Sequence, residues 1–196
     1  MVRLIKEGSG RRVVTGTAGR SCREAIDVAV VWADHHIDRI SRLMFPQPEG
    51  QGGGVPLKMI KPQRDIAVHL PNVIHSTKTG FSVGAAVALA VVFRGLKGLG
   101  AQMRTGIAVT GEINLRGQMI PITGIVPKVQ AARLAGCKKV IVPASHQDDM
   151  AALVGSMWDG EAREWAAANV VSAIDMMDVL ELAIEGGSMQ LLVYVV

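Results

Sequence analysis

The stretch TGIAVTGEINLRGQMIPITGIVPKVQAARLAGCKKVIVP, residues 105–143, decides the fold class, because strand-like and helix-like patterns follow each other within it. Apolar runs bounded by Gly or Pro are typical of strands, and the turn at Arg116-Gly117 predicts a hairpin. Gly136 stands where a helix C-cap is expected. The predicted elements are a strand at Thr105–Thr110, a hairpin of Ile113–Leu115 and Gln118–Ile122, a helix at Val126–Ala135 and a strand at Lys138–Val142.

The same alternation continues outward on both sides of this stretch. Ser21-Cys22-Arg23-Glu24 has the pattern of a capping box, with Ser21 as the N-cap of a helix that ends near Phe45. Pro46–Gln63 holds four prolines and four glycines, which predicts a flexible loop over about residues 46–63. The other expected strands are Arg11–Thr17, Asp65–Leu70 and Val170–Ala173, and the other expected helices are Ser82–Leu96, one starting at Ser145, Glu161–Ala168 and Met176–Ile184.

Length and composition are those of one globular unit. The chain has 196 residues, of which 49% are apolar and 19% charged, a balance that excludes intrinsic disorder. No internal repeat is visible, so we expect residues 1–196 to form a single domain. Its class is α/β, of the α+β type, with mixed small sheets packed by helices.

Several classes of protein are excluded by simple patterns. The two cysteines make neither a disulfide scaffold nor a zinc knuckle. The longest apolar stretch, Val83–Phe93, is shorter than the ~20 residues of a membrane span. No targeting signal is visible near Met1, so we expect a soluble intracellular protein of the cytoplasm or an organelle matrix.

The net charge of +4 does not by itself predict a nucleic-acid interface. The 21 Lys and Arg residues are spread along the chain, and no aromatic residues alternate with them. The five histidines show no metal-ligand spacing, and no P-loop or dinucleotide fingerprint is present. We therefore expect no metal and no cofactor on this chain.

Two helix starts carry residues that could do chemistry. Ser82 stands where a glycine-rich loop enters an apolar helix, so it is either an N-cap or a nucleophile whose oxyanion the helix N–H groups would hold. Lys128 lies in the first turn of the next helix, where the dipole and apolar neighbours disfavour its charged form. It either extends to water or acts as a general base.

Three segments closely resemble the proteolytic domain of Lon proteases. They are TKTGFSVG at 77–84, VTGEINLRGQ at 109–118 and PITGIVPKVQAA at 121–132. The likeness is best over about residues 64–143, which includes DIAVHLP at 65–71 and AGCKKVIVP at 135–143. The segments stand in the order and at the spacing that the family shows.

The resemblance implies a peptidase with a serine–lysine dyad. It places Ser82 as the nucleophile and Lys128 as the general base, with Thr110 hydrogen-bonding and aiming the lysine. It also implies hydrolysis of unfolded proteins or peptides, assembly into a homo-oligomeric ring, and an ATPase module that drives ATP-dependent proteolysis. ATP would be bound by that module, which is absent from this sequence.

The chain departs from the family pattern near these residues. Thr79 replaces an acidic residue, Phe81 replaces a proline, and Pro127 replaces an acidic residue beside Lys128. The strand hairpin that opens the family domain looks truncated before Arg11. An inactive Lon-like assembly or peptide-binding module is therefore the alternative to a serine peptidase, and a basic nucleic-acid-binding domain is a weaker third.

Overall fold

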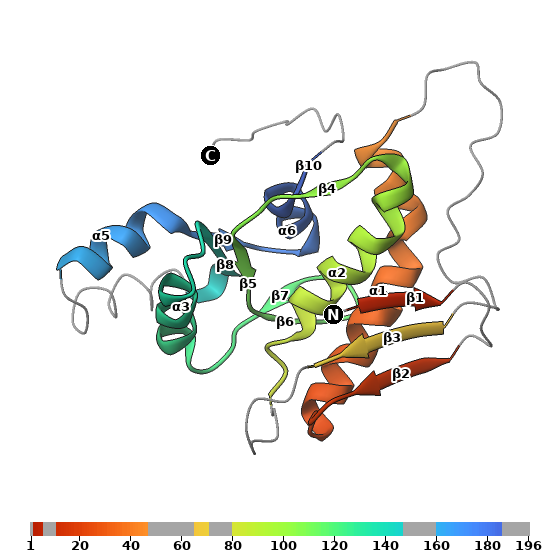
Figure 1. Ribbon diagram of the computed structural model, residues 1–196, viewed down its shortest axis with the longest axis horizontal. Helices are drawn as coiled ribbons and strands as arrows, with labels where there is room; N and C mark the ends of the chain where they lie inside the picture. The colour runs from red at the N-terminus through yellow and green to blue at the C-terminus, as the bar shows by residue number, and fades with distance from the viewer. Residues whose placement is uncertain (1, 6–10, 47–64, 71–79, 147–159, 186–196) are drawn as a thin grey trace.

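The computed structural model describes residues 2–5, 11–46, 65–70, 80–146 and 160–185. Within them the chain is α/β, as predicted, with five α-helices and four small sheets (Figure 1). The helices are α1 (Arg20–Met44), α2 (Gly84–Leu96), α3 (Ile125–Leu134), α5 (Gly160–Asn169) and α6 (Met176–Ala183). None of the described helices is long and apolar enough to cross a membrane.

One sheet, in the order β1-β3-β2, joins β1 (Val2–Ile5), β2 (Arg12–Thr15) and β3 (Asp65–His69). In β3, Ile66 and Val68 are buried, as the predicted alternation requires. β1 runs antiparallel to β3, and β2 runs parallel to it. β1 lies before Arg11, where no strand was predicted. It was missed because it is short and because its pairing partner, β3, lies far along the chain.

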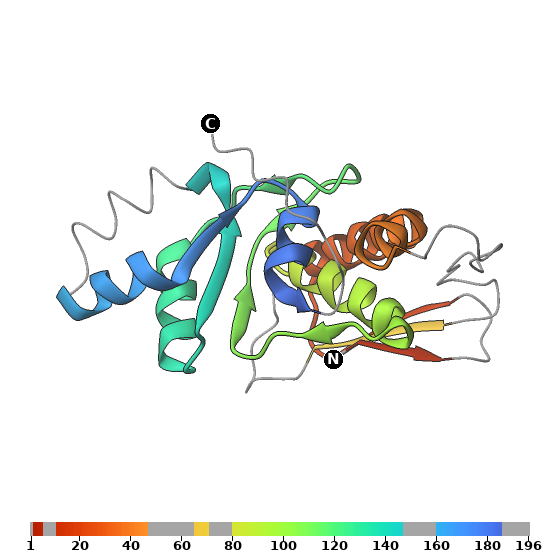
Figure 2. The same cartoon turned by 90° about the horizontal axis from the view of Figure 1, so that it is seen from above.

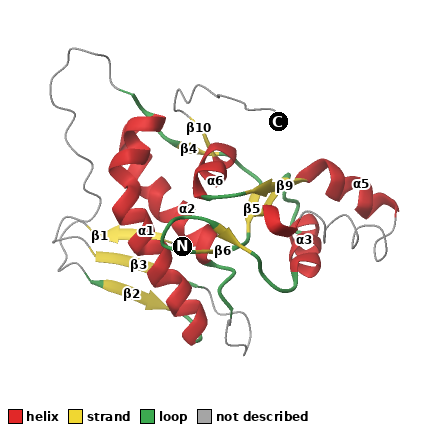
Figure 3. Cartoon of the chain, turned by 180° about the vertical axis from the view of Figure 1, so that it is seen from behind, coloured by secondary structure: helices red, strands yellow, loops and turns green. Residues whose placement is uncertain are grey.

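Helices α1 and α2 pack against each other beside this sheet (Figure 3). Ala29 and Ala33 of α1 and Ala85 and Ala88 of α2 are fully buried, and such small side chains let two helices approach closely. The predicted capping box is wrong, because α1 begins at Arg20 with Gly19 as its N-cap and no side-chain cap. The predicted start of α2 is also early, since the helix begins at Gly84 rather than Ser82.

A second three-stranded sheet, entirely parallel, joins β5 (Ile107–Val109), β8 (Lys139–Pro143) and β9 (Val170–Ala173), with β8 in the middle. Val140 and Val142 of β8 pack in one hydrophobic cluster with α3 and α5, whereas Ile141 packs in the larger cluster with α1, α2 and α6. Figures 1 and 2 show α3 and α5 at one end of the molecule and the β1-β3-β2 sheet at the other.

The remaining strands form two ribbons. β6 (Glu112–Ile113) and β7 (Met119–Ile120) make the predicted hairpin, and β4 (Gln102–Met103) pairs with β10 (Ile184–Glu185). A capping box is present at the start of α6, between Asp175 and Asp178. Of the helix predicted from Ser145, only a 3-10 turn at Ala144–His146 lies among the described residues, and the loop predicted at 46–63 lies outside them except for Pro46.

Gly117, in the hairpin turn, meets both a backbone and a packing constraint. Its φ is +83°, and a Cβ at this position would overlap the indole ring of Trp32. We predict that Gly117→Ala lowers the free energy of unfolding by about 2–4 kcal/mol, from left-handed strain plus overpacking. Urea unfolding followed by tryptophan fluorescence measures the change. Gly98→Ala is the control, because an added Cβ there meets nothing within 4 Å, and an equal loss in both variants would contradict the explanation.

Candidate active site

Ser82 lies in the turn that leads into α2, one residue before the N-cap. The N-cap is Val83, which makes no side-chain capping bond, so the interpretation of Ser82 as an N-cap is wrong. The Ser82 side chain is half-buried, and its hydroxyl has no hydrogen-bond partner among the described residues. It is therefore a hydroxyl that the fold places at a helix N-terminus without using it to stabilise the helix.

The backbone of Gly111 holds the Ser82 turn in place. Gly111 N donates to Ser82 O at 3.1 Å, and Ala85 N donates to Gly111 O at 3.0 Å. A Cβ on Gly111 would lie 2.5 Å from Met119 Cε and 3.2 Å from Pro143 Cγ, so a larger residue here would require the Met119 side chain to move. Thr110, its neighbour, is 9% exposed and donates its N–H to Ile141 O at 3.0 Å, which extends the pairing of β5 with β8. The structure thus brings Ser82 beside the Thr110 segment.

Lys128 occupies the first turn of α3, as predicted. The helix N-cap is Gly124, with φ +68°, and the half-buried Lys128 donates from Nζ to Thr123 O at 2.8 Å. Among the described residues no hydrogen bond joins Lys128 to Ser82 or to the Thr110 side chain. The Lys128 Nζ is thus held by the loop in front of its own helix.

A residue that the sequence did not single out anchors that loop. His146 is 6% exposed, and its Nε2 accepts a hydrogen bond from the backbone N–H of Ile122 at 2.8 Å. The segment from Ile122 to Gly124 therefore lies between a bond to His146 and the bond from Lys128 to Thr123. No local pattern could reveal this anchor, because its two partners are distant in sequence.

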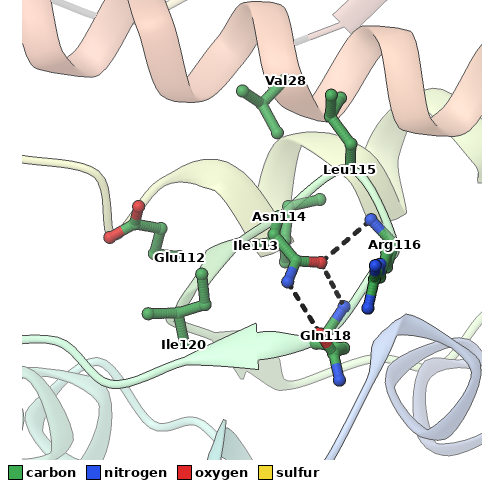
Figure 4. A pocket seen from close by; sticks show the side chains of 8 residues that line it. All are labelled: Val28, Glu112, Ile113, Asn114, Leu115, Arg116, Gln118 and Ile120. Carbon is green, nitrogen blue, oxygen red and sulfur yellow. Dashed lines mark hydrogen bonds between the residues drawn. The ribbon is translucent and has the colours of Figure 1, made fainter.

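The β6–β7 hairpin and α1 enclose an open groove of about 460 Å³ (Figure 4). Val28, Ile120 and Leu115 give it apolar walls, while Glu112 and Arg116 supply opposite charges. Asn114 is occupied within the turn, where Oδ1 accepts the N–H groups of Arg116 and Gln118 and Nδ2 donates to Gln118 Oε1. Burial, and then the nearby Glu24, raise the pKa of the Glu112 carboxyl group above its ordinary value.

Among the described residues no group of three or more His, Cys, Asp or Glu side chains could hold a metal ion. The turn before α2 presents the Ser82 hydroxyl and backbone N–H groups, and the first turn of α3 presents the Lys128 amine. Such groups are suited to acyl transfer.

Comparison with known proteins gives a consistent result. The sequence profile of the Lon protease (S16) C-terminal proteolytic domain matches residues 2–185. The human "Lon protease homolog 2, peroxisomal" is 31% identical over 92% of this chain and 19% of its own length. "Lon protease 2" of Thermus thermophilus is 30% identical over 93% of this chain and 20% of its own length. "Lon protease 2" of Syntrophobacter fumaroxidans is 33% identical over 76% of this chain and 16% of its own length. The chain spans about a fifth of the length of the curated relatives it matches.

His146→Ala removes the acceptor for the Ile122 N–H and leaves that part-buried donor without it. We predict a loss of about 1–3 kcal/mol in the free energy of unfolding. In amide exchange by NMR, the Ile122 N–H should also lose protection. The control is His35→Ala, an exposed histidine on α1, which should change stability by less than about 0.5 kcal/mol. Unchanged Ile122 protection in His146→Ala would show that the bond does not hold the loop.

Glu112 makes stability depend on pH in a defined direction. Because the folded state raises the pKa of Glu112, that state binds the proton more tightly than the unfolded chain, and this contribution to stability is lost as pH rises through the folded pKa. Glu112→Gln should therefore be more stable than the parent at pH 7, with the difference vanishing well below pH 4.5, the ordinary value for this carboxyl group. Urea unfolding at both pH values tests this. Glu164→Gln, at an exposed position of α5, is the control, and a gain of the same size there would refute the prediction.

Proposed function

The chain belongs to the Lon protease (S16) C-terminal proteolytic domain family, and from this premise we propose that it is a serine-type endopeptidase domain with Ser82 as nucleophile and Lys128 as general base. We further propose that residues 1–196 form a single domain of this kind. One observation carries the proposal. The fold holds the Ser82 backbone against Gly111, beside Thr110, and leaves the Ser82 hydroxyl without a partner among the described residues.

Acylation begins when the neutral Lys128 amine takes the Ser82 proton. The Oγ electron pair forms a bond to the scissile carbonyl carbon, and the carbonyl oxygen becomes an oxyanion. The N–H groups of Ser82 and Val83 have no partner among the described residues and stand just before the first turn of α2, where we propose that they donate to that oxyanion. As the bond between carbon and nitrogen breaks, Lys128 returns the proton to the leaving amine.

Deacylation repeats these steps with water as the nucleophile. Lys128 takes a proton from water, the hydroxide attacks the ester carbon, and Ser82 leaves as the alkoxide and recovers the proton. Nζ, which donates to Thr123 O in the structure, must reach the Ser82 hydroxyl in acylation and the attacking water in deacylation. Thr110, held beside Ser82 through Gly111, is the proposed partner that aims the amine in that position.

The proposed substrates are unfolded proteins or peptides, cleaved in a homo-oligomeric ring. An ATPase module, in a longer chain or a separate partner, would deliver them in an ATP-dependent manner. No cofactor is proposed for this chain itself. The location stays a prediction of cytoplasm or organelle matrix.

The groove between the β6–β7 hairpin and α1 favours a second candidate, a peptide-binding module without hydrolysis. Its apolar walls and the half-buried carboxylate of Glu112 suit a segment that carries a basic residue beside apolar ones. This function would need neither the Ser82 hydroxyl nor the Lys128 amine.

A peptidyl β-lactone probe separates the two candidates. We predict covalent labelling at Ser82, located by mass spectrometry, because the hydroxyl opens the lactone to an ester and Lys128 removes its proton. Ser82→Ala should abolish labelling, and Lys128→Ala should slow it by roughly 10²–10⁴-fold. Matched controls are Ser145→Ala and Lys138→Ala, which remove an exposed serine and an exposed lysine and should label at the parent rate.

Circular dichroism confirms that each variant is folded before its rate is compared. Labelling that persists in Ser82→Ala, or that is equally fast in Lys128→Ala, would refute the dyad. A folded parent that binds peptide but takes no label would support the peptide-binding module.

A further inference from the structure

Ser21 makes a hydrogen bond that links α1 to the turn carrying Ser82. Gly80 N donates to Ser21 Oγ at 2.9 Å, across 59 residues of sequence. Ser21 lies in the first turn of α1 and does not cap it, because Gly19 is the N-cap and makes no side-chain bond. A glycine N-cap stabilises a helix less than a serine cap does, by only a few tenths of a kcal/mol, and the Ser21 hydroxyl bonds to another segment instead.

At Gly80 the backbone conformation is one that few contacts define. Its φ is +95°, a conformation that other residues rarely adopt, and a Cβ there would meet nothing within 4 Å. Among the described residues, therefore, no packing contact on this side of the Gly80 backbone defines its path. The next residue, Phe81, is 37% exposed and has no ring closed onto its backbone to fix φ.

Three hydrogen bonds set the course of the turn. Gly84 N donates to Phe81 O at 3.0 Å, and Gly111 N donates to Ser82 O at 3.1 Å. These two bonds fix the carbonyl groups of Phe81 and Ser82. Among the described residues the bond from Gly80 N to Ser21 Oγ is the one that fixes an N–H group on the N-terminal side of Ser82.

We propose that Ser21 is a positioning residue, whose hydroxyl holds the Gly80 amide and so fixes the direction from which the backbone brings Ser82 to the reacting carbonyl. This inference rests on the function proposed above. Ser21 touches neither substrate nor the reacting atoms, and it acts through Gly80. A displacement of the nucleophile by about 1 Å is enough to slow an acyl-transfer step by about two orders of magnitude.

The test compares Ser21→Ala, Ser21→Thr and the parent. Ser21→Thr keeps the hydroxyl, and Ser41→Ala is the matched control, since it removes a serine of the same helix whose hydroxyl bonds locally to Asp38 O at 2.9 Å. Two quantities are measured: the rate of Ser82 labelling by the β-lactone probe, and the exchange rate of the Gly80 amide by NMR. In Ser21→Ala we expect labelling to slow by about 5–50-fold and Gly80 exchange to accelerate by about tenfold, as loss of one hydrogen bond implies. Ser21→Thr should restore both, and Ser41→Ala should change neither.

The outcomes separate this inference from the proposed function. If the parent labels at Ser82 and Ser21→Ala labels equally fast, the positioning role is wrong and the peptidase proposal stands. If Gly80 exchange is unchanged in Ser21→Ala, the bond does not restrain the turn and the inference fails whatever the activity. If the parent takes no label at Ser82, the proposed function fails, and the positioning role fails with it.

Discussion

The approach of the Gly111 backbone to the first turn of α2 is the constraint on which the site depends. Gly111 N donates to Ser82 O, and Ala85 N donates to Gly111 O. These two hydrogen bonds join the segment after β5, in the parallel β5-β8-β9 sheet, to the start of a buried helix. Met119 and Pro143 fill the space that a Cβ on residue 111 would take, so a larger residue would disturb the packing behind this contact. The two hydrophobic clusters meet along this sheet, so packing on both of its faces keeps the contact in place.

Much of the fold could be predicted from the sequence, because its elements carry local patterns. The period-2 alternation around Ile66 and Val68, the apolar run of α2 and the turn at Gly117 each depend on neighbouring residues, and the structure contains all three elements. β1 was missed because a four-residue strand is stabilised by the partner with which it pairs. The start of α1 was misplaced because the capping pattern at Ser21 satisfies a distant segment instead.

The sequence indicated where along the chain the candidate site residues lie, but not which hydrogen bonds hold the loops around them. Ser82 lies just before α2 and Lys128 lies in the first turn of α3, close to the helix starts that the motifs indicated. Thr110 follows β5, a strand of the parallel β5-β8-β9 sheet. The bonds that hold the surrounding loops, from Gly80 to Ser21 and from Ile122 to His146, join residues that no local pattern connects. Pairings of this kind follow from the finished tertiary structure, so they could not be inferred before it.

The β2–α1–β3 unit affects when, during folding, the Ser82 site forms. Its two parallel strands pair only after a long helix has crossed between them, and such non-local pairings form late, because loop closure costs entropy before any contact repays it. The turn that carries Ser82 comes after β3 in the sequence, and its Ser21 contact waits for the same crossover. If Ser82 cleaves peptide bonds as proposed, a newly made chain would hold no aligned nucleophile while its own segments are still unfolded, and so would be protected from digesting itself.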